Sequence, residues 1–564
     1  MQLPGVTDIQ KYKKRHKELL YNRSHWEPIW KDLCSYVLPQ YGRALYPGFE
    51  TRPRRGDDDM VTSWPTMAAR VTAAGLQSGM TSKSRQWWRA SLPDPEMSRF
   101  PAIRRWLDEV TYRMTFVMGQ SNFYEGTYGV WSQAPTYGTG VTVFLDDFED
   151  VIRAHTLMIG EYALASDYTL RNNTLYRSFY MRTWELVNTF GKKNVSRQVR
   201  NEYDRNDTEQ WHHIIHAIEP NDDRIRDGRS NRNMPYRSVY FEADVSEDDE
   251  GVLEIKGYEE KPFATFRWEL AGRDDYGFGP GWVVLPDCKE LHATQRDRGV
   301  GIEKSVNPPL QAPVADMDKI VNAAPGGLSF YSGMVSGSGG GIKPLYEVAP
   351  DLNGIQLSLS ELRQLIDQAY YKDLFLALMM RSGGSAEKTA REVMEIQQEK
   401  LLMLSPALER ADEYLDDAIN RIFGIMLRGG LFPPPPPDIE DQEITIEYVS
   451  ILAQAQQMIE SAKIEQGSAF IAQLASLYPE ARDILDPDAI GEGYLSAIQI
   501  PQRMLTDPRV REQIRRSRAE AERQAAQMAQ MQQIVEQGKT LSEADMSGQN
   551  ALNALLQGAA GGIR

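Results

Sequence analysis

The fold is decided by residues 357–385, which read LSLSELRQLIDQAYYKDLFLALMMRSGGS. Apolar side chains recur there at spacings of three and four residues, at Leu359, Leu362, Ile366 and Tyr370. This spacing predicts a helix with one apolar face over residues 355–376. The glycine pair that follows lacks the side chains that restrict the backbone, so we expect the helix to end before it. Taken alone, the segment also fits an ordinary helical hairpin in a core.

A second, longer helix is expected from Thr389 to Arg428. Glu392 lies three residues after Thr389, which is the spacing of a capping box. Pro406 has no backbone N–H to donate, so we expect a bend there. The tip between the two helices, residues 377–388, carries methionines and one arginine.

The chain before this segment changes its period once. Helical spacing predicts helices within residues 8–38, within 65–80 and from Pro101 onward. From Gly140 the period becomes two, which predicts antiparallel strands. We expect strands at 141–145, 151–157, 174–181, 210–218, 236–245, 251–256 and 262–268, with helix over 183–204. The fold class is therefore α+β and predominantly helical.

A loop-rich module is expected between two helical rods. The first rod covers residues 285–306, and the second is the helix over 355–376. Residues 307–350 between them contain two proline-rich turns and, from Gly333 to Gly341, five glycines. Loops of this length are functional or disordered. Within the module, residues 328–331 and 342–348 could pair as a hairpin.

The C-terminal part reads as a spacer, a strand and helices. Five prolines occupy residues 433–437, and a strand is expected over 444–448. From Pro508 to Gln537 no helix breaker occurs, and the apolar stripe is thin. Such a helix is expected to dock on neighbours or to self-associate, for example in a barrel. A frayed tail is the alternative, and the last 20 residues are expected to be mobile.

Composition excludes several classes of protein. The 564 residues carry a net charge of −16, so the chain lacks the basic balance of proteins that grip duplex DNA. Residues 241–260 hold nine carboxylates and are expected to include a solvated loop. No run of 18 apolar residues and no secretory signal is found. Two cysteines, Cys34 and Cys288, exclude a disulfide framework, so we expect folding inside the cell.

Catalytic motifs are not found. Gly538-Lys539-Thr540 lacks the earlier glycine of a phosphate-binding loop and ends a helix. His212 and His216 would lie about 13 Å apart on a strand, too far for one metal ion. A two-metal nuclease site with scattered carboxylates stays open, without positive support. We therefore expect no enzyme, no cofactor and no metal.

Several short motifs together resemble the head-to-tail connector, or portal, family of short-tailed double-stranded DNA phages. In chain order they are Ala73–Ser82, Trp87-Trp88, Trp106-Leu107, Ser121–Tyr124, Tyr137–Gly140, Tyr276–Pro280, Asn307–Leu310, Pro325–Gly327 and Thr389–Val393. The similarity covers roughly residues 15–455, and the combination is more specific than any one motif. Arg391 departs from the family, which more often has threonine before the glutamate.

The resemblance implies a portal-type protomer with wing, stem, clip and crown regions. They would be distributed as wing 1–284, first stem helix 285–306, clip 307–350, second stem helix 351–376, tunnel loop 377–388, kinked wing helix and strand 389–449, crown and possible helical barrel 450–537, and mobile tail 538–564. The tunnel loop would face DNA through Met379, Met380, Arg381, Ser382, Gly383, Gly384 and Lys388. The clip would dock partners through Gly327, Phe330, Tyr331, Gly339, Gly340, Gly341 and Lys343.

The implied function is a DNA channel at one capsid vertex, for packaging and ejection. A homo-oligomer ring, usually of twelve copies, would contact the terminase motor, tail adaptors, and capsid and scaffolding proteins, and double-stranded DNA without sequence preference, but no membrane. The ring would assemble in the host cytoplasm and remain in the virion at the portal vertex. The alternatives are a structural head or tail-tube protein that never contacts DNA, and a packaging-motor enzyme.

Overall fold

Helices and small sheets build the chain, which confirms the predicted α+β, mainly helical class. The computed structural model describes residues 6–46, 60–94, 97, 100–224, 233–245, 251–313, 327–331, 343–344, 351–380, 390–439, 444–449, 470–471, 473–474, 491 and 508–543. The chain divides into two compact units, Met1–Gly467 and Ser468–Arg564. Each unit is described by itself.

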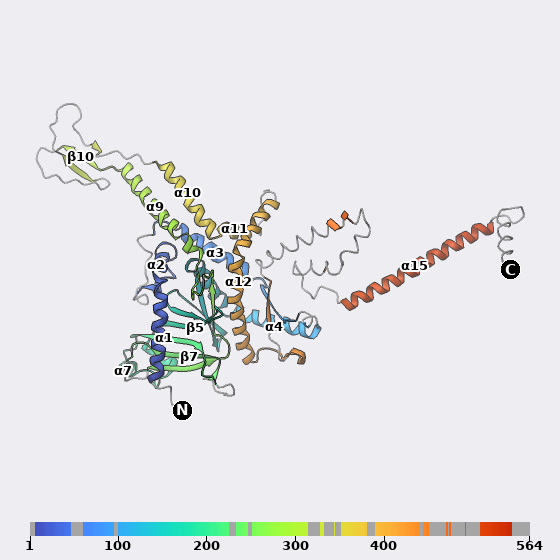
Figure 1. Cartoon of the computed structure of the whole chain (residues 1–564), viewed down its shortest axis with the longest axis horizontal. Coiled ribbons are helices and arrows are strands. Elements are labelled where there is room, and N and C mark those ends of the chain that lie inside the picture. The colour runs from blue at the N-terminus through green and yellow to red at the C-terminus, as the bar shows by residue number, and fades with distance from the viewer. Residues whose placement is uncertain are drawn as a thin grey trace, which may run out of the picture. The chain divides into compact units, whose positions relative to one another are not determined.

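The first unit begins with five helices (Figure 1). They are α1 (Val6–Ser24), α2 (Glu27–Tyr36), α3 (Trp64–Met80), α4 (Pro101–Gln120) and α5 (Phe123–Tyr137). Proline stands in the first turn of α2, α3 and α4, where a backbone N–H would have no partner within the helix. Gly138 ends α5 in the left-handed region, with φ of +83°. α1 to α4 lie where the spacing predicts helices, and α5 is a further helix in a region expected to be mostly helical.

Two antiparallel sheets follow. The smaller has the order β3 (Val151–Leu157), β2 (Thr139–Asp147), β9 (Phe263–Arg267), and the larger has the order β4 (Tyr162–Ser166), β5 (Asn172–Arg182), β6 (Trp211–Pro220), β7 (Tyr236–Glu242), β8 (Val252–Tyr258). All the strands expected between 141 and 268 are present. The expected helix over 183–204 is two short helices, α6 (Thr183–Phe190) and α7 (Arg197–Asp204). β4 was not expected, because its side chains are nearly all buried and do not alternate.

The main core lies between the smaller sheet, the helices α3, α4 and α5, and the long helix α12 (Ala390–Arg428). α12 runs as one helix through Pro406, so the proline does not divide it. Its buried side chains include Tyr414, whose ring lies 5.6 Å from that of Trp131 on α5. Strand β13 (Thr445–Tyr448), expected from its sequence, pairs with an unexpected strand, β1 (Trp88–Ser91).

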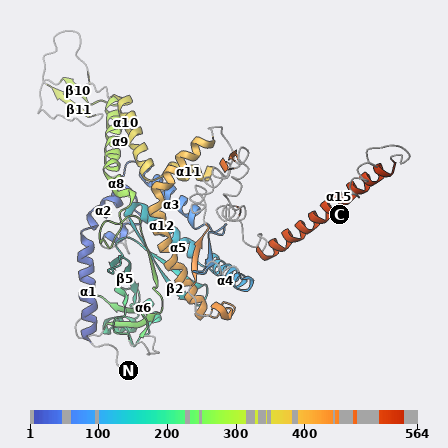
Figure 2. The same cartoon turned by 45° about the vertical axis from the view of Figure 1, so that its right-hand side comes forward.

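Helices α9 (Leu285–Val306) and α10 (Leu352–Ala369) run side by side away from the sheets (Figure 2). The single turn α8 (Pro280–Val283) precedes α9. At the far end, three short strands form a sheet in the order β11 (Leu328–Tyr331), β10 (Leu310–Pro313), β12 (Lys343–Pro344). The helix predicted over 285–306 is confirmed.

Two predictions in this part are wrong. The strands at 328–331 and 343–344 do not pair with each other, because β10 lies between them, parallel to β11 and antiparallel to β12. The single helix over 355–376 is broken: α10 ends at Ala369 and α11 (Lys372–Met380) begins after Tyr371, whose φ is +53°. A positive φ interrupts an α-helix even where the apolar spacing continues.

The second unit contains the helix α15 (Pro508–Glu543). At 1.5 Å per residue its 36 residues span roughly 54 Å. It extends past the expected end at Gln537. The apolar side chains Ile514, Met528 and Met531 are all exposed in this chain. Among the residues described, no helix is long and apolar enough to cross a membrane.

Candidate functional site

The base of α9 is fixed by the segment Tyr276–Gly281, which packs backbone against backbone on the end of α5. A Cβ atom at Gly277 would lie 2.5 Å from the carbonyl oxygen of Gly138, and one at Gly279 would lie 2.6 Å from that of Pro135. Neither space admits a side chain. The glycines of this motif are therefore required for the contact, which holds the start of α9 on the core.

Further along α9, His292 joins three segments of the chain. Its Nδ1 accepts hydrogen bonds from the backbone N–H groups of Val61 (3.1 Å) and Thr62 (3.3 Å), and its Nε2 donates to the carbonyl oxygen of Tyr36 (2.9 Å). The side chain is 1% exposed. Burial raises the pKa of the neighbouring Cys288 thiol to about 12, so the reactive thiolate form is suppressed.

A second cluster fixes the break between α10 and α11. Asp367 accepts a hydrogen bond from the indole Nε1 of Trp64 (3.0 Å) and forms an ion pair with Lys372 (2.8 Å). The Lys372 ammonium lies 4.2 Å from the centre of the Trp64 ring, within range of a cation–π interaction. The hydroxyl of the buried Tyr370 contacts that of Thr136 (3.3 Å). The direction of α11 is thus set by side chains of α3, α5 and α10.

α11 lies directly on α3, with Leu374 and Phe375 buried in the main core. A Cβ atom at Gly75 of α3 would lie 2.2 Å from Cδ1 of Phe375. This close approach explains the glycine in the motif Ala73–Ser82. α11 leads toward residues 381–389, so Gly75 positions the helix that precedes the expected tunnel loop.

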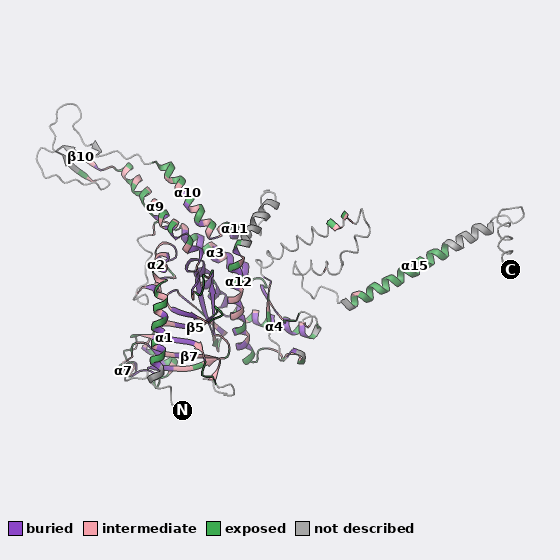
Figure 3. Ribbon diagram, in the orientation of Figure 1, coloured by how far each residue is buried: buried purple, intermediate pink, exposed green. Residues whose placement is uncertain are grey.

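The outer part of α9 and one face of α10 expose apolar side chains, in contrast to the side chains that both helices bury on the core (Figure 3). Val306 is 80% exposed and Leu357 is 62% exposed, whereas Leu359 and Ile366 are fully buried. Val300, Ile302, Leu352 and Leu365 are also exposed. Exposed apolar side chains along two helices indicate a surface that contacts another protein.

The predicted tunnel-loop residues are only partly described. Met379 and Met380 belong to the last turn of α11, so this helix overlaps the expected tunnel loop over residues 377–380. Arg381, Ser382, Gly383, Gly384 and Lys388 lie outside the described residues.

The predicted clip residues fall on the small sheet or outside the described residues. Gly327 precedes β11, and its carbonyl oxygen accepts a hydrogen bond from the N–H of Leu310 (2.8 Å). Phe330 and Tyr331 are in β11, and Lys343 is in β12, on the opposite side of β10. Gly339, Gly340 and Gly341 lie outside the described part of the chain.

The histidines of β6 are separately partnered. His212 Nε2 lies 2.7 Å from Glu202, and the buried His216 Nε2 lies 2.8 Å from the Ser238 hydroxyl. Across the described ranges, no group of three or more His, Cys, Asp or Glu side chains is placed to hold a metal ion.

Sequence reasoning missed the residues that hold the two rods. Trp64, Asp367 and Lys372 carry no recognisable motif, and only their contacts reveal them. The glycines at 75, 277 and 279 do lie within the motifs quoted above, but the sequence does not show which backbone each of them approaches.

Comparison with known proteins places the chain in a family. The family model for bacteriophage head to tail connecting protein matches residues 9–505. The "Probable portal protein" of Bordetella phage BPP-1 is 35% identical over 539 residues, covering 95% of this chain and 96% of the relative. The "Portal protein" of Salmonella phage epsilon15 is 34% identical over 556 residues, covering 98% and 99%. The resemblance seen in the sequence is confirmed: the chain belongs to the family of bacteriophage head-to-tail connecting proteins.

Proposed function

We propose that this chain is a phage portal subunit whose copies close into a ring and conduct double-stranded DNA during packaging and ejection. The observation that carries the proposal is the match to head-to-tail connecting proteins over residues 9–505, with portal proteins aligned over nearly the whole chain. The proposed ring has twelve copies. It assembles in the host cytoplasm, contacts the terminase motor first and tail adaptors later, and stays at one vertex of the virion.

The arrangement of the rods supports the proposed regions. α9 and α10 form the stem, because their base is fixed in the core while their outer apolar side chains are left for neighbouring copies. Residues 307–350, which connect the ends of the two rods, form the clip. Residues 1–284 and 389–449 form the wing. The tunnel loop follows α11, and residues 450–537 form the crown.

The charge of the chain supports a channel without strong adhesion. Each copy carries −16 charges, so a ring is strongly negative and DNA phosphates are not gripped. In the proposal Arg381 and Lys388 touch phosphate transiently, and Met379 and Met380 form an apolar lip. Capsid and scaffolding proteins are the remaining partners, through surfaces of the wing.

The test is to image the purified oligomer end-on. A closed ring with a central hole supports the portal, and a stable monomer under assembly conditions contradicts it. A hydrolysis assay on the same material separates the portal from a packaging-motor enzyme, because an ATPase hydrolyses nucleotide without partners.

A variant tests the channel itself. Arg381→Ala is expected to leave ring assembly intact and to change DNA packaging or retention, because it removes a proposed phosphate contact. Arg381→Lys, which keeps the positive charge at this position, is the matched control. Normal packaged length and infectivity in Arg381→Ala would remove Arg381 from the proposal.

A further inference from the structure

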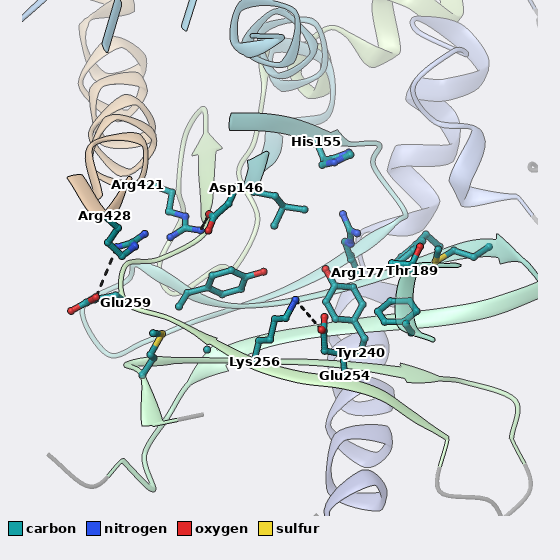
Figure 4. A pocket seen from close by; sticks show the side chains of 17 residues that line it. Asp146, His155, Arg177, Thr189, Tyr240, Glu254, Lys256, Glu259, Arg421 and Arg428 are labelled. Carbon is teal, nitrogen blue, oxygen red and sulfur yellow. Dashed lines mark hydrogen bonds and ion pairs between the residues drawn. The ribbon is translucent and has the colours of Figure 1, made fainter. Parts of the chain in front are cut away.

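A cavity of about 750 Å³ lies between the two sheets, away from α9, α10 and α11 (Figure 4). Strands β5, β7 and β8 of the larger sheet line one side. His155 of β3, Asp146 of β2 and Arg421 of α12 line the other. Its volume is within the range of small-molecule pockets.

Three of the four cations that line the cavity are paired with carboxylates. Arg421 pairs with Asp146 (2.6 Å) and Glu260 (2.9 Å), Lys256 pairs with Glu254 (2.8 Å), and Arg428 pairs with Glu260 and Glu259. The lining contains no further carboxylate. Arg177 of β5 is the fourth cation, and no ion pair is formed with it by the residues that the structure describes.

Arg177 is held in place by contact with an aromatic ring, and not by a carboxylate. Its guanidinium carbon lies 4.4 Å from the centre of the Phe179 ring. Its Nε is buried, and no described residue accepts a hydrogen bond from it. A buried donor without a partner in the chain can be satisfied by a water molecule or by an acceptor on a ligand.

The groups around Arg177 do not supply negative charge. Burial, and then the charge of Arg177 itself, lowers the pKa of both His155 and His216, so their imidazoles are neutral near pH 7. Burial raises the pKa of Tyr240, so its hydroxyl stays protonated. His155 and Tyr240 line the cavity and can donate hydrogen bonds to a ligand, but none of these three groups neutralises the guanidinium.

Aromatic side chains provide the rest of the lining. Phe179, Phe190, Tyr240 and Tyr258 line it, and the rings of Phe190 and Tyr240 lie 5.3 Å apart. Their ring faces suit a flat, apolar body, and Arg177 suits a carboxylate or a phosphate, which it can bind through two parallel N–H donors.

We propose that this cavity binds a small organic anion, with its carboxylate or phosphate on Arg177 and its planar body against the aromatic side chains. The proposed site does not depend on DNA conduction, so it would still be expected if the proposed channel function were wrong. Because a bound ligand would contact both sheets and α12, binding would also stabilise the wing.

The experiment is calorimetric titration of the full-length assembled protein with adenosine monophosphate, inorganic phosphate and uncharged adenosine. Adenosine monophosphate is expected to bind saturably, inorganic phosphate at least tenfold more weakly, and adenosine not measurably. Arg177→Gln should weaken adenosine monophosphate binding at least tenfold. Arg171→Gln, which removes an arginine whose side chain is 76% exposed, should leave it unchanged.

A third variant keeps the positive charge of Arg177 and places a large side chain at the lining of the cavity. Thr189 is exposed at the cavity lining, so Thr189→Trp should obstruct entry while the fold and Arg177 persist. Melting temperature and ring assembly check the folding of all three variants. The proposal is overturned if neither anion binds the unmodified protein at millimolar concentration, or if folded Arg177→Gln binds adenosine monophosphate as well as the unmodified protein does.

Discussion

Substitution of Gly75 by alanine has two opposing effects on the free energy of unfolding. Alanine in a helix interior is favoured over glycine by about 1 kcal/mol. Against this, the added Cβ would lie 2.2 Å from Cδ1 and 2.7 Å from Cβ of Phe375. Overpacking of a filled core typically destabilises by about 1–3 kcal/mol. Because the clash reaches the base of the Phe375 side chain and not only its tip, we expect a net loss of about 1–2 kcal/mol.

The assay is urea unfolding of a double-mutant cycle. Phe375→Ala alone should lose about 3–5 kcal/mol, because it empties a buried site. In the double variant the new methyl group occupies part of that space, so the total loss should fall short of the sum by at least about 1 kcal/mol. Gly119→Ala on α4, where a Cβ meets nothing within 4 Å, is the control and should be neutral or stabilising. Equal or higher stability of Gly75→Ala, or strict additivity, would refute the contact.

Three further outcomes are expected. Gly138→Ala should lose about 3 kcal/mol or more and reduce soluble yield, because its φ is +83° and a Cβ would lie 1.9 Å from the Gly277 carbonyl oxygen; normal yield and melting temperature would contradict this. Leu357→Glu should fold but fail to assemble in sedimentation, whereas the exposed neighbour Gln356→Glu should assemble normally; assembly of both would place the ring contact elsewhere. Burial raises the pKa of the Asp412 carboxyl from 3.8 to about 7. The folded state therefore binds this proton more tightly than the unfolded state does. The stability that this provides is complete below pH 3.8 and is lost as pH rises through 7. Asp412→Asn should therefore stabilise by on the order of 2 kcal/mol at pH 8 and have little effect at pH 4, and a gain of equal size at both would exclude this carboxyl as the cause.

Periodicity predicts an element when one of its faces is buried and the other is not. The strand at 151–157 and the helix at 285–306 were found this way. β4 was not, because Tyr162–Ser166 is buried on both faces. The break after α10 was not found either, since Leu374 keeps the spacing that begins at Leu359. Spacing records which side chains are buried, and not that the φ of Tyr371 is positive.

The candidate site was accessible to sequence reasoning only through motifs. The motif Ala73–Ser82 pointed to Gly75, but its partner Phe375 lies 300 positions later and belongs to another helix. Arg177 carried no signal, because an unpaired arginine differs from a paired one only in its neighbours. Contacts of this kind depend on how distant segments pack, which local spacing does not record.

In the proposed ring, folding and ring formation use different faces of the same helix. Leu359 is fully buried against the core, whereas Leu357, two residues away, is 62% exposed. Truncation of Leu359 to alanine removes core contacts and should lose about 2–5 kcal/mol in a single chain. A change at Leu357 removes nothing from that core, so its effect must come from another copy. If each copy folded only within the ring, substitutions at Leu357 and at Leu359 would both reduce folding and assembly together. The contrast in burial between these two side chains argues against that arrangement.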